Sequence, residues 1–412
     1  MNVPGALTTS ATATEPTARQ EPTVNREPTT NQEPTACQEP TTNRKPSNNR
    51  EPSTRRQPPG GGPDRGRVLV ARLDDAGDVL LAGPAVRAVR AGAREVVLLA
   101  GPRGRAAAEL LPGVDQVIEW RAPWIDHDPP PVDMDRVNEL VQQVTGVDEA
   151  LILTSFHQSA LPLALLLRLA GVRRISAISE DYPGSLLDVR HVVDESRDVP
   201  EAERMLALAR AAGFELPPDD QGKLAVRRPL PDIGHVIGNL VDTGTGAGEG
   251  AYVVVHPGTS APARTWPAER HRQAVRELAE DGHRVVVTGK ERELTAYVAH
   301  DVAVDLGGRT TLSQLAALIE RAGVLVAGNT GPAHLAAAVG TPVVSLFAPV
   351  VPSARWAPYG VPTVLLGDQR ALCRDTRARE CPIPGHPCLS QVTSEQVVKA
   401  VRELTSECRS DL

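Results

Sequence analysis

The stretch VLVAGNTGPAHLAAA at residues 324–338 decides the fold class. A short apolar run leads into a Gly-Asn-Thr-Gly turn, and an Ala-rich segment then carries Pro332 near its start. This pattern predicts a strand, a tight loop and a helix N-terminus, whose first N–H groups point outward at the positive end of the helix dipole. Small residues at Gly328, Thr330 and Gly331 leave room for a phosphate there. The stretch is typical either of a site for a phosphorylated ligand or of an ordinary strand-to-helix turn.

Strands and helices alternate outward from this stretch in both directions. In the second half the sequence predicts strands at 252–256, 284–288, 324–327 and 342–347, with helices at 267–281, 291–299, 312–321 and after the Gly-rich turn. In the first half it predicts strands at 67–73, 95–100, 116–120, 150–154 and 174–178, with helices around 79–89, 106–111, 134–145, 160–170 and 201–212. Such alternation favours parallel sheets flanked by helices. We therefore expect an α/β protein with two sheets in series, whose ligands bind in the crevice at the carboxyl ends of the strands.

The first 64 residues differ from the rest. From Glu15 a six-residue unit recurs, as in EPTARQ, EPTVNR and EPTTNQ, and its Pro blocks helix and sheet pairing. The segment has almost no apolar residue to offset the entropy of ordering. We expect a disordered tail at 1–64, an N-terminal domain at 65–225 and a C-terminal domain at 226–412, with a flexible Gly-rich loop at 242–250. The tail is interpreted as inert or as a docking segment for a partner.

Composition narrows the function classes. The 412 residues carry a net charge of −7, which argues against a nucleic-acid partner. No apolar run reaches the roughly 20 residues that a membrane span needs, and the N-terminus lacks the pattern of a signal peptide. Five cysteines in a chain of this length do not indicate a disulfide scaffold. We expect a cytoplasmic protein, and a peripheral contact with a membrane stays open.

Asp78 is the first candidate for chemistry. It follows the first predicted strand in the segment DDAGDVL, beside Gly77. A carboxylate in that place can take a proton from a hydroxyl. It can equally be an N-cap or first-turn acid of the next helix, which the helix dipole favours.

The segment HPGTSAPARTWP at 256–267 is the second candidate. Thr259 and Ser260 offer hydroxyl and N–H donors to an anion, and Arg264 can form a forked contact with a phosphate or simply lie on the surface. His334, one turn into the helix after Gly331, can reach the same crevice or pack in the core.

Three blocks of the sequence together resemble glycosyltransferase family 9, the heptosyltransferase family. RLDDAGDVLLAGPAVRAVR at 72–90 is similar to the family's opening R-x-x-x-x-G-D-x-[IVL] element, and VVVHPGTSAPARTWPAERH at 253–271 to its phosphate-loop strand. LVAGNTGPAHLAAAVGTPVVSLFAP at 325–349 is similar to the signature [DN]-[ST]-G-x-x-H-x-A-A and the strand after it. The resemblance implies a GT-B fold, in which two Rossmann-like domains face a central cleft.

The resemblance also implies an activity. Members transfer a sugar from a nucleotide-diphosphate sugar, typically ADP-heptose, to an acceptor hydroxyl, with inversion and without a metal or other cofactor. The family's catalytic base matches Asp78. The position two residues before Trp-Pro is usually Lys and is Arg264 here. Helix-dipole binding together with Arg264 can replace a divalent ion beside the departing diphosphate.

The donor-binding residues expected from these blocks are Thr259, Ser260, Arg264, Asn329, Thr330, Gly331 and His334. A family acid that contacts the ribose falls after Gly289, where Glu291 matches better than Glu293. The best-known lipopolysaccharide enzymes have Asp where this chain has Asn329, so the sugar can differ. The acceptor stays open among a glycan, a lipid-linked molecule and a small molecule.

Two alternatives remain beside the heptosyltransferase interpretation. The first is a transferase that uses another nucleotide sugar, and the second is a silent nucleotide-binding scaffold, against which the presence of Asp78 argues. A dehydrogenase is disfavoured because the first strand-to-helix turn lacks G-x-G-x-x-G. Cys373, Cys381 and Cys388 lack the C-x₂-C spacing of a zinc knuckle, so we expect free or paired thiols rather than a metal site.

Overall fold

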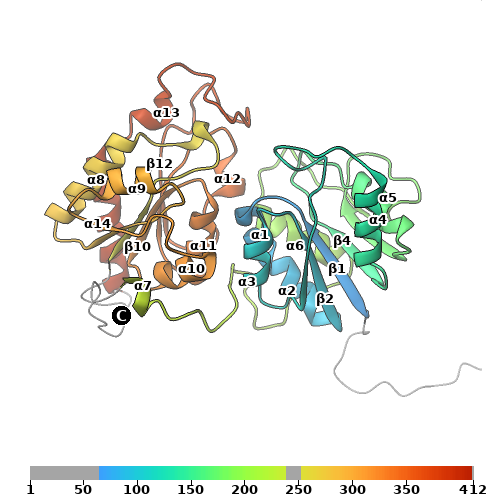
Figure 1. Ribbon diagram of the computed structural model, residues 1–412. Helices are drawn as coiled ribbons and strands as arrows, with labels where there is room; N and C mark the ends of the chain where they lie inside the picture. The colour runs from blue at the N-terminus through green and yellow to red at the C-terminus, as the bar shows by residue number, and fades with distance from the viewer. Residues whose placement is uncertain (1–64, 238–251, 411–412) are drawn as a thin grey trace, which may run out of the picture. The chain divides into compact units, whose positions relative to one another are not determined.

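The computed structural model describes residues 65–237 and 252–410. The predicted tail at 1–64, with Cys37, and the Gly-rich loop at 242–250 lie outside the described residues. The described residues form two six-stranded parallel sheets flanked by helices (Figure 1). This arrangement confirms the predicted α/β class.

The first sheet is built around a buried run of Val and Leu. Its strand order is β3-β2-β1-β4-β5-β6. The strands are β1 (Arg67–Arg72), β2 (Glu95–Ala100), β3 (Gln116–Glu119), β4 (Glu149–Ile152), β5 (Arg174–Ile178) and β6 (Val189–His191). Alternate residues of β1 enter different hydrophobic clusters, with Val68 and Val70 in one and Leu69 and Ala71 in another. Both faces are therefore buried, as in other parallel sheets.

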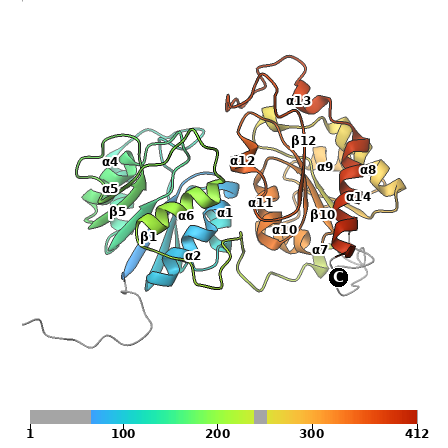
Figure 2. The same cartoon turned by 180° about the vertical axis from the view of Figure 1, so that it is seen from behind.

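Helices cover both faces of this sheet. They are α1 (Ala76–Leu81), α2 (Gly83–Gly92), α3 (Arg105–Leu110), α4 (Met134–Gln143), α5 (Leu161–Leu169) and α6 (Glu201–Ala211). In Figure 2, α2 and α6 lie together on one face. The single helix predicted around 79–89 is two helices, α1 and α2. The reason is Pro84, whose missing N–H and fixed φ suit a helix start and interrupt a helix interior.

The second sheet has the order β12-β11-β10-β7-β8-β9. Its strands are β7 (Val253–His256), β8 (Val285–Val287), β9 (Val304–Asp305), β10 (Val324–Gly328), β11 (Val343–Leu346) and β12 (Thr363–Leu366). The helices around it are α7 (Gly234–Ile237), η2 (Pro262–Arg264), α8 (Ala268–Glu280), α9 (Arg292–Ala299), α10 (Leu312–Glu320), α11 (Gly331–Val339), α12 (Ser353–Trp356), α13 (Pro387–Ser390) and α14 (Ser394–Ser410). None of the described helices is long and apolar enough to cross a membrane.

Both sheets share the Rossmann strand order, in which the first and fourth strands lie side by side. Successive connections leave in opposite directions from the β1/β4 pair and from the β7/β10 pair. Ligands of such sheets bind beyond the carboxyl ends of the strands at this switch point. The segments after β1 and β4, and those after β7 and β10, are therefore where a site is expected.

Candidate active site

Asp78 lies just beyond the carboxyl end of β1. The helix α1 begins at Ala76, with Asp75 at the N-cap, so Asp78 is in the first turn and is not the N-cap. Its Oδ1 atom accepts a hydrogen bond from Arg72 Nη2 at 2.9 Å, and its side chain is 25% exposed. The carboxylate is thus fixed in orientation on one side and open to a ligand on the other.

Arg72 is a buried cation that the sequence analysis missed. Its guanidinium forms an ion pair with Asp74 at 3.1 Å and donates to Ser155 Oγ at 2.9 Å, next to β4. Burial opposes its charge, but Asp74 and Asp78 outweigh that effect and raise the pKa of Arg72. Arg72 therefore links the ends of β1 and β4 and holds Asp78 in place.

Hydrogen bonds within the loop after β7 fix its conformation. Thr259 Oγ1 donates to the backbone oxygen of Ala261 at 2.9 Å and lies 2.7 Å from Thr265 Oγ1. That hydroxyl is engaged within the loop, whereas Ser260 is exposed. The donor-binding roles of Thr259 and Ser260 stay predictions, and the contacts give Thr259 a structural part in shaping the loop.

Arg264 ends the short helix η2 in this loop. Its Nε atom is buried and has no hydrogen-bond partner, and no ion pair joins its guanidinium to any carboxylate in the described residues. Burial lowers the pKa of Arg264, while the nearby charges of Asp78 and Asp75 oppose that shift. A partly desolvated guanidinium without a counterion is a receptor for an anion.

The helix α11 begins directly after β10, with Thr330 at its N-cap. Thr330 Oγ1 donates back to the oxygen of Gly328 at 3.3 Å, and no side chain caps the first turn. Asn329 is 4% exposed, and its Nδ2 atom has no hydrogen-bond partner. The helix N-terminus and this amide therefore leave donors free for an anion.

His334 lies in the first turns of α11. It is 4% exposed, and its Nδ1 atom has no hydrogen-bond partner. Burial lowers the pKa of His334 to about 4, and Asp78 only partly opposes this. The ring is therefore neutral near pH 7 and can give or take one hydrogen bond.

The helices α1 and α11 begin beside one another. A methyl group added to Gly77 would lie 2.8 Å from Cδ2 of His334 and 3.3 Å from Cα of Gly331. On the same side, Trp356 Nε1 of α12 lies 3.4 Å from Asp78 Oδ1. Asp78, His334 and Gly331 are thus brought together, and their roles toward a ligand stay predictions.

Glu291 is placed apart from this group. It is the exposed N-cap residue of α9, beyond the end of β8, and Glu293 is exposed in the first turn of the same helix. Within residues 65–237 and 252–410, no side-chain hydrogen bond or ion pair joins Glu291 to another residue. Its position at the carboxyl edge of the sheet is compatible with the predicted ribose contact, which stays a prediction.

A second buried charge cluster was also missed. Arg355 of α12 is 3% exposed and forms ion pairs with Glu195 and Asp198, each at 2.7 Å. Arg204 of α6 forms a further ion pair with Glu195 at 2.7 Å. Arg355 lies about 150 residues from the other three and belongs to no recognisable motif with them, so only the fold brings it to them. These ion pairs anchor α12, and Trp356, the residue after Arg355, contacts Asp78.

Cys373, Cys381 and Cys388 are free thiols. Cys373 and Cys388 are buried and Cys381 is partly buried. Burial and the neighbouring Cys373 raise the pKa of Cys388 to about 12. Among the residues that the structure describes, no group of three or more His, Cys, Asp and Glu side chains is placed to hold a metal ion.

Comparison with known proteins identifies the family of this chain. The sequence model of glycosyltransferase family 9 (heptosyltransferase) matches residues 138–385, which is more than half of the chain. The chain is 30% identical over 165 residues to lipopolysaccharide heptosyltransferase 3 of Escherichia coli, a match that covers 37% of this chain and 46% of that protein. The chain spans less than half the length of this relative, and the same holds for its matches to lipopolysaccharide heptosyltransferase 3 of Escherichia coli K12 and lipopolysaccharide heptosyltransferase 1 of Pseudomonas aeruginosa.

Solved structures share the fold. A family 9 glycosyltransferase from Veillonella parvula has a TM-score of 0.68 at 19% identity, covering 84% of this chain and 98% of that one. The Escherichia coli heptosyltransferase WaaC with ADP-2-deoxy-2-fluoro heptose has a TM-score of 0.58 at 20% identity, covering 82% and 99%. At these identities the likeness concerns the fold. The match of the family model over residues 138–385 shows that the chain belongs to glycosyltransferase family 9, the heptosyltransferase family.

Proposed function

We propose that the protein is an inverting, metal-independent glycosyltransferase that moves a heptose from ADP-heptose to an acceptor hydroxyl. One observation carries the proposal. A carboxylate at the switch point of the first sheet, Asp78, lies beside the N-terminus of α11, and Arg264, whose charge acts on both Asp78 and His334, forms no ion pair within the described residues. A proton acceptor and an anion receptor are what this transfer requires, one on each side of the sugar.

In the proposed reaction Asp78 accepts the proton of the acceptor hydroxyl. The oxygen then bonds to the anomeric carbon while the bond from that carbon to the diphosphate oxygen breaks. The electron pair leaves with the diphosphate, and attack from the opposite side inverts the anomeric centre. Arg72 keeps the Asp78 carboxylate in position through its 2.9 Å hydrogen bond.

On the donor side, Arg264 and the free N–H groups of α11 take the charge that develops on the diphosphate. Asn329 and the neutral ring of His334 offer further hydrogen bonds, because each has a buried nitrogen without a partner. The choice of ADP-heptose rests on family membership and on the WaaC structure, whose ligand is an ADP-heptose analogue.

The test is a donor panel of ADP-heptose, UDP-hexoses and GDP-hexoses. Each donor is offered with heptose-free lipopolysaccharide core, lipid-linked sugars or alkyl glycosides, with and without EDTA, and release of the nucleoside diphosphate is measured. Of these donors, we expect only ADP-heptose to release its nucleoside diphosphate, and EDTA should not change the rate of that release. Preference for another donor, or loss of release in EDTA, would contradict the corresponding part of the proposal.

Asp78→Asn tests the base. Loss of the general base is expected to slow release by a factor of about 10² to 10⁴ while ADP affinity stays unchanged. Asp135→Asn is the matched control, because Asp135 is also a first-turn acid, in the exposed start of α4. Near-normal release by Asp78→Asn would remove Asp78 from the reaction.

A further inference from the structure

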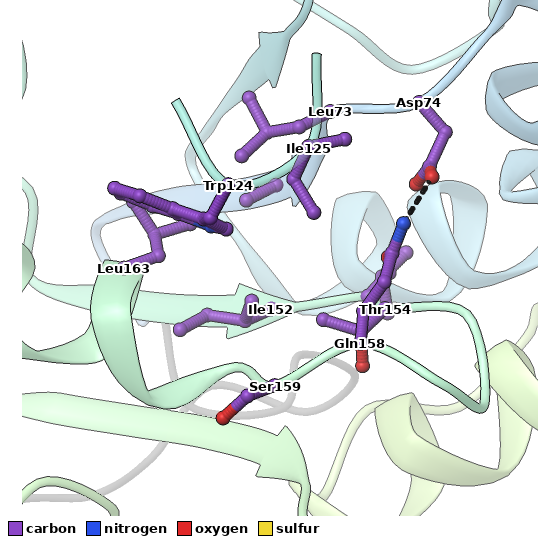
Figure 3. Close-up of a pocket in the computed structure, with 11 residues that line it drawn as sticks. Leu73, Asp74, Trp124, Ile125, Ile152, Thr154, Gln158, Ser159 and Leu163 are labelled. Atoms are coloured by element: carbon purple, nitrogen blue, oxygen red, sulfur yellow. Dashed lines mark hydrogen bonds between the residues drawn. The ribbon is translucent and has the colours of Figure 1, made fainter. Parts of the chain in front are cut away.

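A small pocket lies beyond the carboxyl ends of β1 and β4, apart from the residues expected to bind the donor. Figure 3 shows polar side chains on one side of it and apolar side chains on the other. Asp74, Thr154 and Gln158 form the polar side, and Trp124 and Leu163 are part of the apolar side. The cavity volume is about 10 Å³, close to the room that one water-sized group needs.

Thr154 gives this pocket a free hydroxyl. The residue is 6% exposed, and its Oγ1 atom has no hydrogen-bond partner. A buried hydroxyl without a hydrogen-bond partner destabilises the fold. Its backbone oxygen accepts from Arg204 Nη1 at 2.6 Å, so the main chain is fixed while the side chain is unsatisfied. An unpaired buried hydroxyl in a residue that lines a pocket indicates a hydrogen-bonding group in that pocket, either a water or a polar group of a ligand.

Gln158 and Asp74 are only partly satisfied. Gln158 Nε2 donates to Asp74 Oδ1 at 2.5 Å, and its Oε1 accepts from the N–H of Ser155 at 3.0 Å. The amide keeps a second N–H, and the Asp74 carboxyl, which also pairs with Arg72, keeps further acceptor capacity. The wall therefore offers donors and acceptors together, next to the free hydroxyl of Thr154.

The charges select a neutral ligand group. No Lys or Arg is among the residues that line the pocket. The guanidinium groups of Arg72 and Arg204 contact lining residues, and both are already paired, Arg72 with Asp74 and Asp78 and Arg204 with Glu195. An anion would have no unpaired cation to bind in the pocket, and a cation would be repelled by the positive charge of Arg72. A hydroxyl can both donate and accept, and the apolar wall with Trp124 suits the C–H face of a sugar.

We propose that the pocket binds a second hydroxyl of the acceptor, which is a neutral polyhydroxylated molecule. The proposal rests on the proposed function, because one guanidinium, that of Arg72, contacts both Asp74 of the pocket and the base Asp78. A hydroxyl held by Thr154 and Gln158 would orient the neighbouring hydroxyl toward Asp78. The pocket then determines specificity, and Thr154 is a binding residue rather than a catalytic one.

The test uses methyl hexopyranosides as probes, titrated by ligand-observed NMR in the presence of ADP. Each parent glycoside is compared with its monodeoxy forms and with its uronate. We expect one deoxy position to weaken binding to the native protein by about tenfold, as expected when a buried polar group is left unpaired, and the uronate to bind more weakly than the parent. Thr154→Val should lose most of the difference between the parent and that deoxy form, and Thr154→Ser should keep it.

Ser176→Ala is the matched control, because Ser176 is buried in β5 with an equally unpartnered hydroxyl. It should keep the native preference. ADP binding, measured in the same samples, reports folding and separates the two proposals. If ADP binds and no pyranoside does, if Thr154→Val keeps the preference, or if the uronate binds best, the pocket proposal is overturned. If ADP itself does not bind the native protein, the proposed function fails.

Discussion

Replacing Arg264 by Met should change stability and binding in opposite directions. The guanidinium is partly buried, its Nε has no partner, and burial lowers its pKa. Such a charge stabilises a bound diphosphate but destabilises the unliganded fold. Met keeps much of the side-chain volume and removes the charge, so the two effects can be measured separately.

The size of each effect follows from the contacts. Hydrogen bonds to charged groups contribute about 1.5 to 3 kcal/mol, which corresponds to a loss of ADP affinity by a factor of about 10 to 100. Removing a partly buried charge without a counterion should raise the free energy of unfolding of the unliganded protein by about 1 kcal/mol. Arg264→Lys keeps the charge but lacks the fork, so we expect an intermediate ADP affinity.

Isothermal titration with ADP gives the affinity, and urea unfolding without ligand gives the stability. Arg276→Met is the control, since Arg276 is 60% exposed on α8 and lies 3.9 Å from its partner Glu280. It should change neither quantity. Unchanged ADP affinity in Arg264→Met would refute the anion-receptor role. A clear loss of stability in the unliganded variant would refute the inference that the charge is unpaired.

The other predictions concern stability and are measured by the same urea unfolding. Arg355→Met should lower the free energy of unfolding by about 3 kcal/mol, because it leaves buried carboxylates without their cation; a change below 1 kcal/mol would contradict this. Burial lowers the pKa of His271 to about 3 and those of His256 and His334 to about 4, so the unfolded chain binds more protons and stability should fall as the pH drops from 6.5 to 5, by up to about 4 kcal/mol per pH unit. His271→Phe should remove roughly a third of that slope, and an unchanged slope would exclude His271. Gly77→Ala should destabilise the protein by about 1 to 3 kcal/mol, because the added methyl group would lie 2.8 Å from His334. In Gly83→Ala the closest atom, in Leu111, is 3.4 Å away, so this substitution should be neutral or stabilising. Equal effects of the two substitutions would contradict the close approach of α1 and α11.

The central strands could be predicted from the sequence because their residues are buried on both faces. β1 and β10 read as continuous apolar runs, and both were placed within one or two residues. The edge strands β6, β9 and β12 were missed. They have two to four residues, partly exposed, and therefore carry little hydrophobic signal.

The candidate site also contains residues that could be predicted from the sequence and residues that could not. Asp78 and the start of α11 follow strands along the chain, so their place at the sheet edge could be inferred from local pattern alone. Arg72 could not, since a charged residue at the end of an apolar run looks like the end of the strand and not like a buried cation. The partners of Arg355 could not be predicted either, because Glu195 lies 160 residues away and pairs with it only in the folded chain.

Loop chemistry was the least predictable part. The Thr259 hydroxyl, which was expected to donate to an anion, donates to Ala261 within the loop, and its role toward an anion stays a prediction. Sequence cannot distinguish a hydroxyl that serves a ligand from one that serves its own turn, because Ser and Thr do both.

The most direct measurement of the central claim is a crystal structure of the protein with ADP-2-deoxy-2-fluoro heptose. The account predicts that the diphosphate lies within hydrogen-bond distance of Arg264 and the first N–H groups of α11, with the anomeric carbon facing the carboxylate of Asp78. A diphosphate bound elsewhere, or a sugar turned away from Asp78, would contradict it.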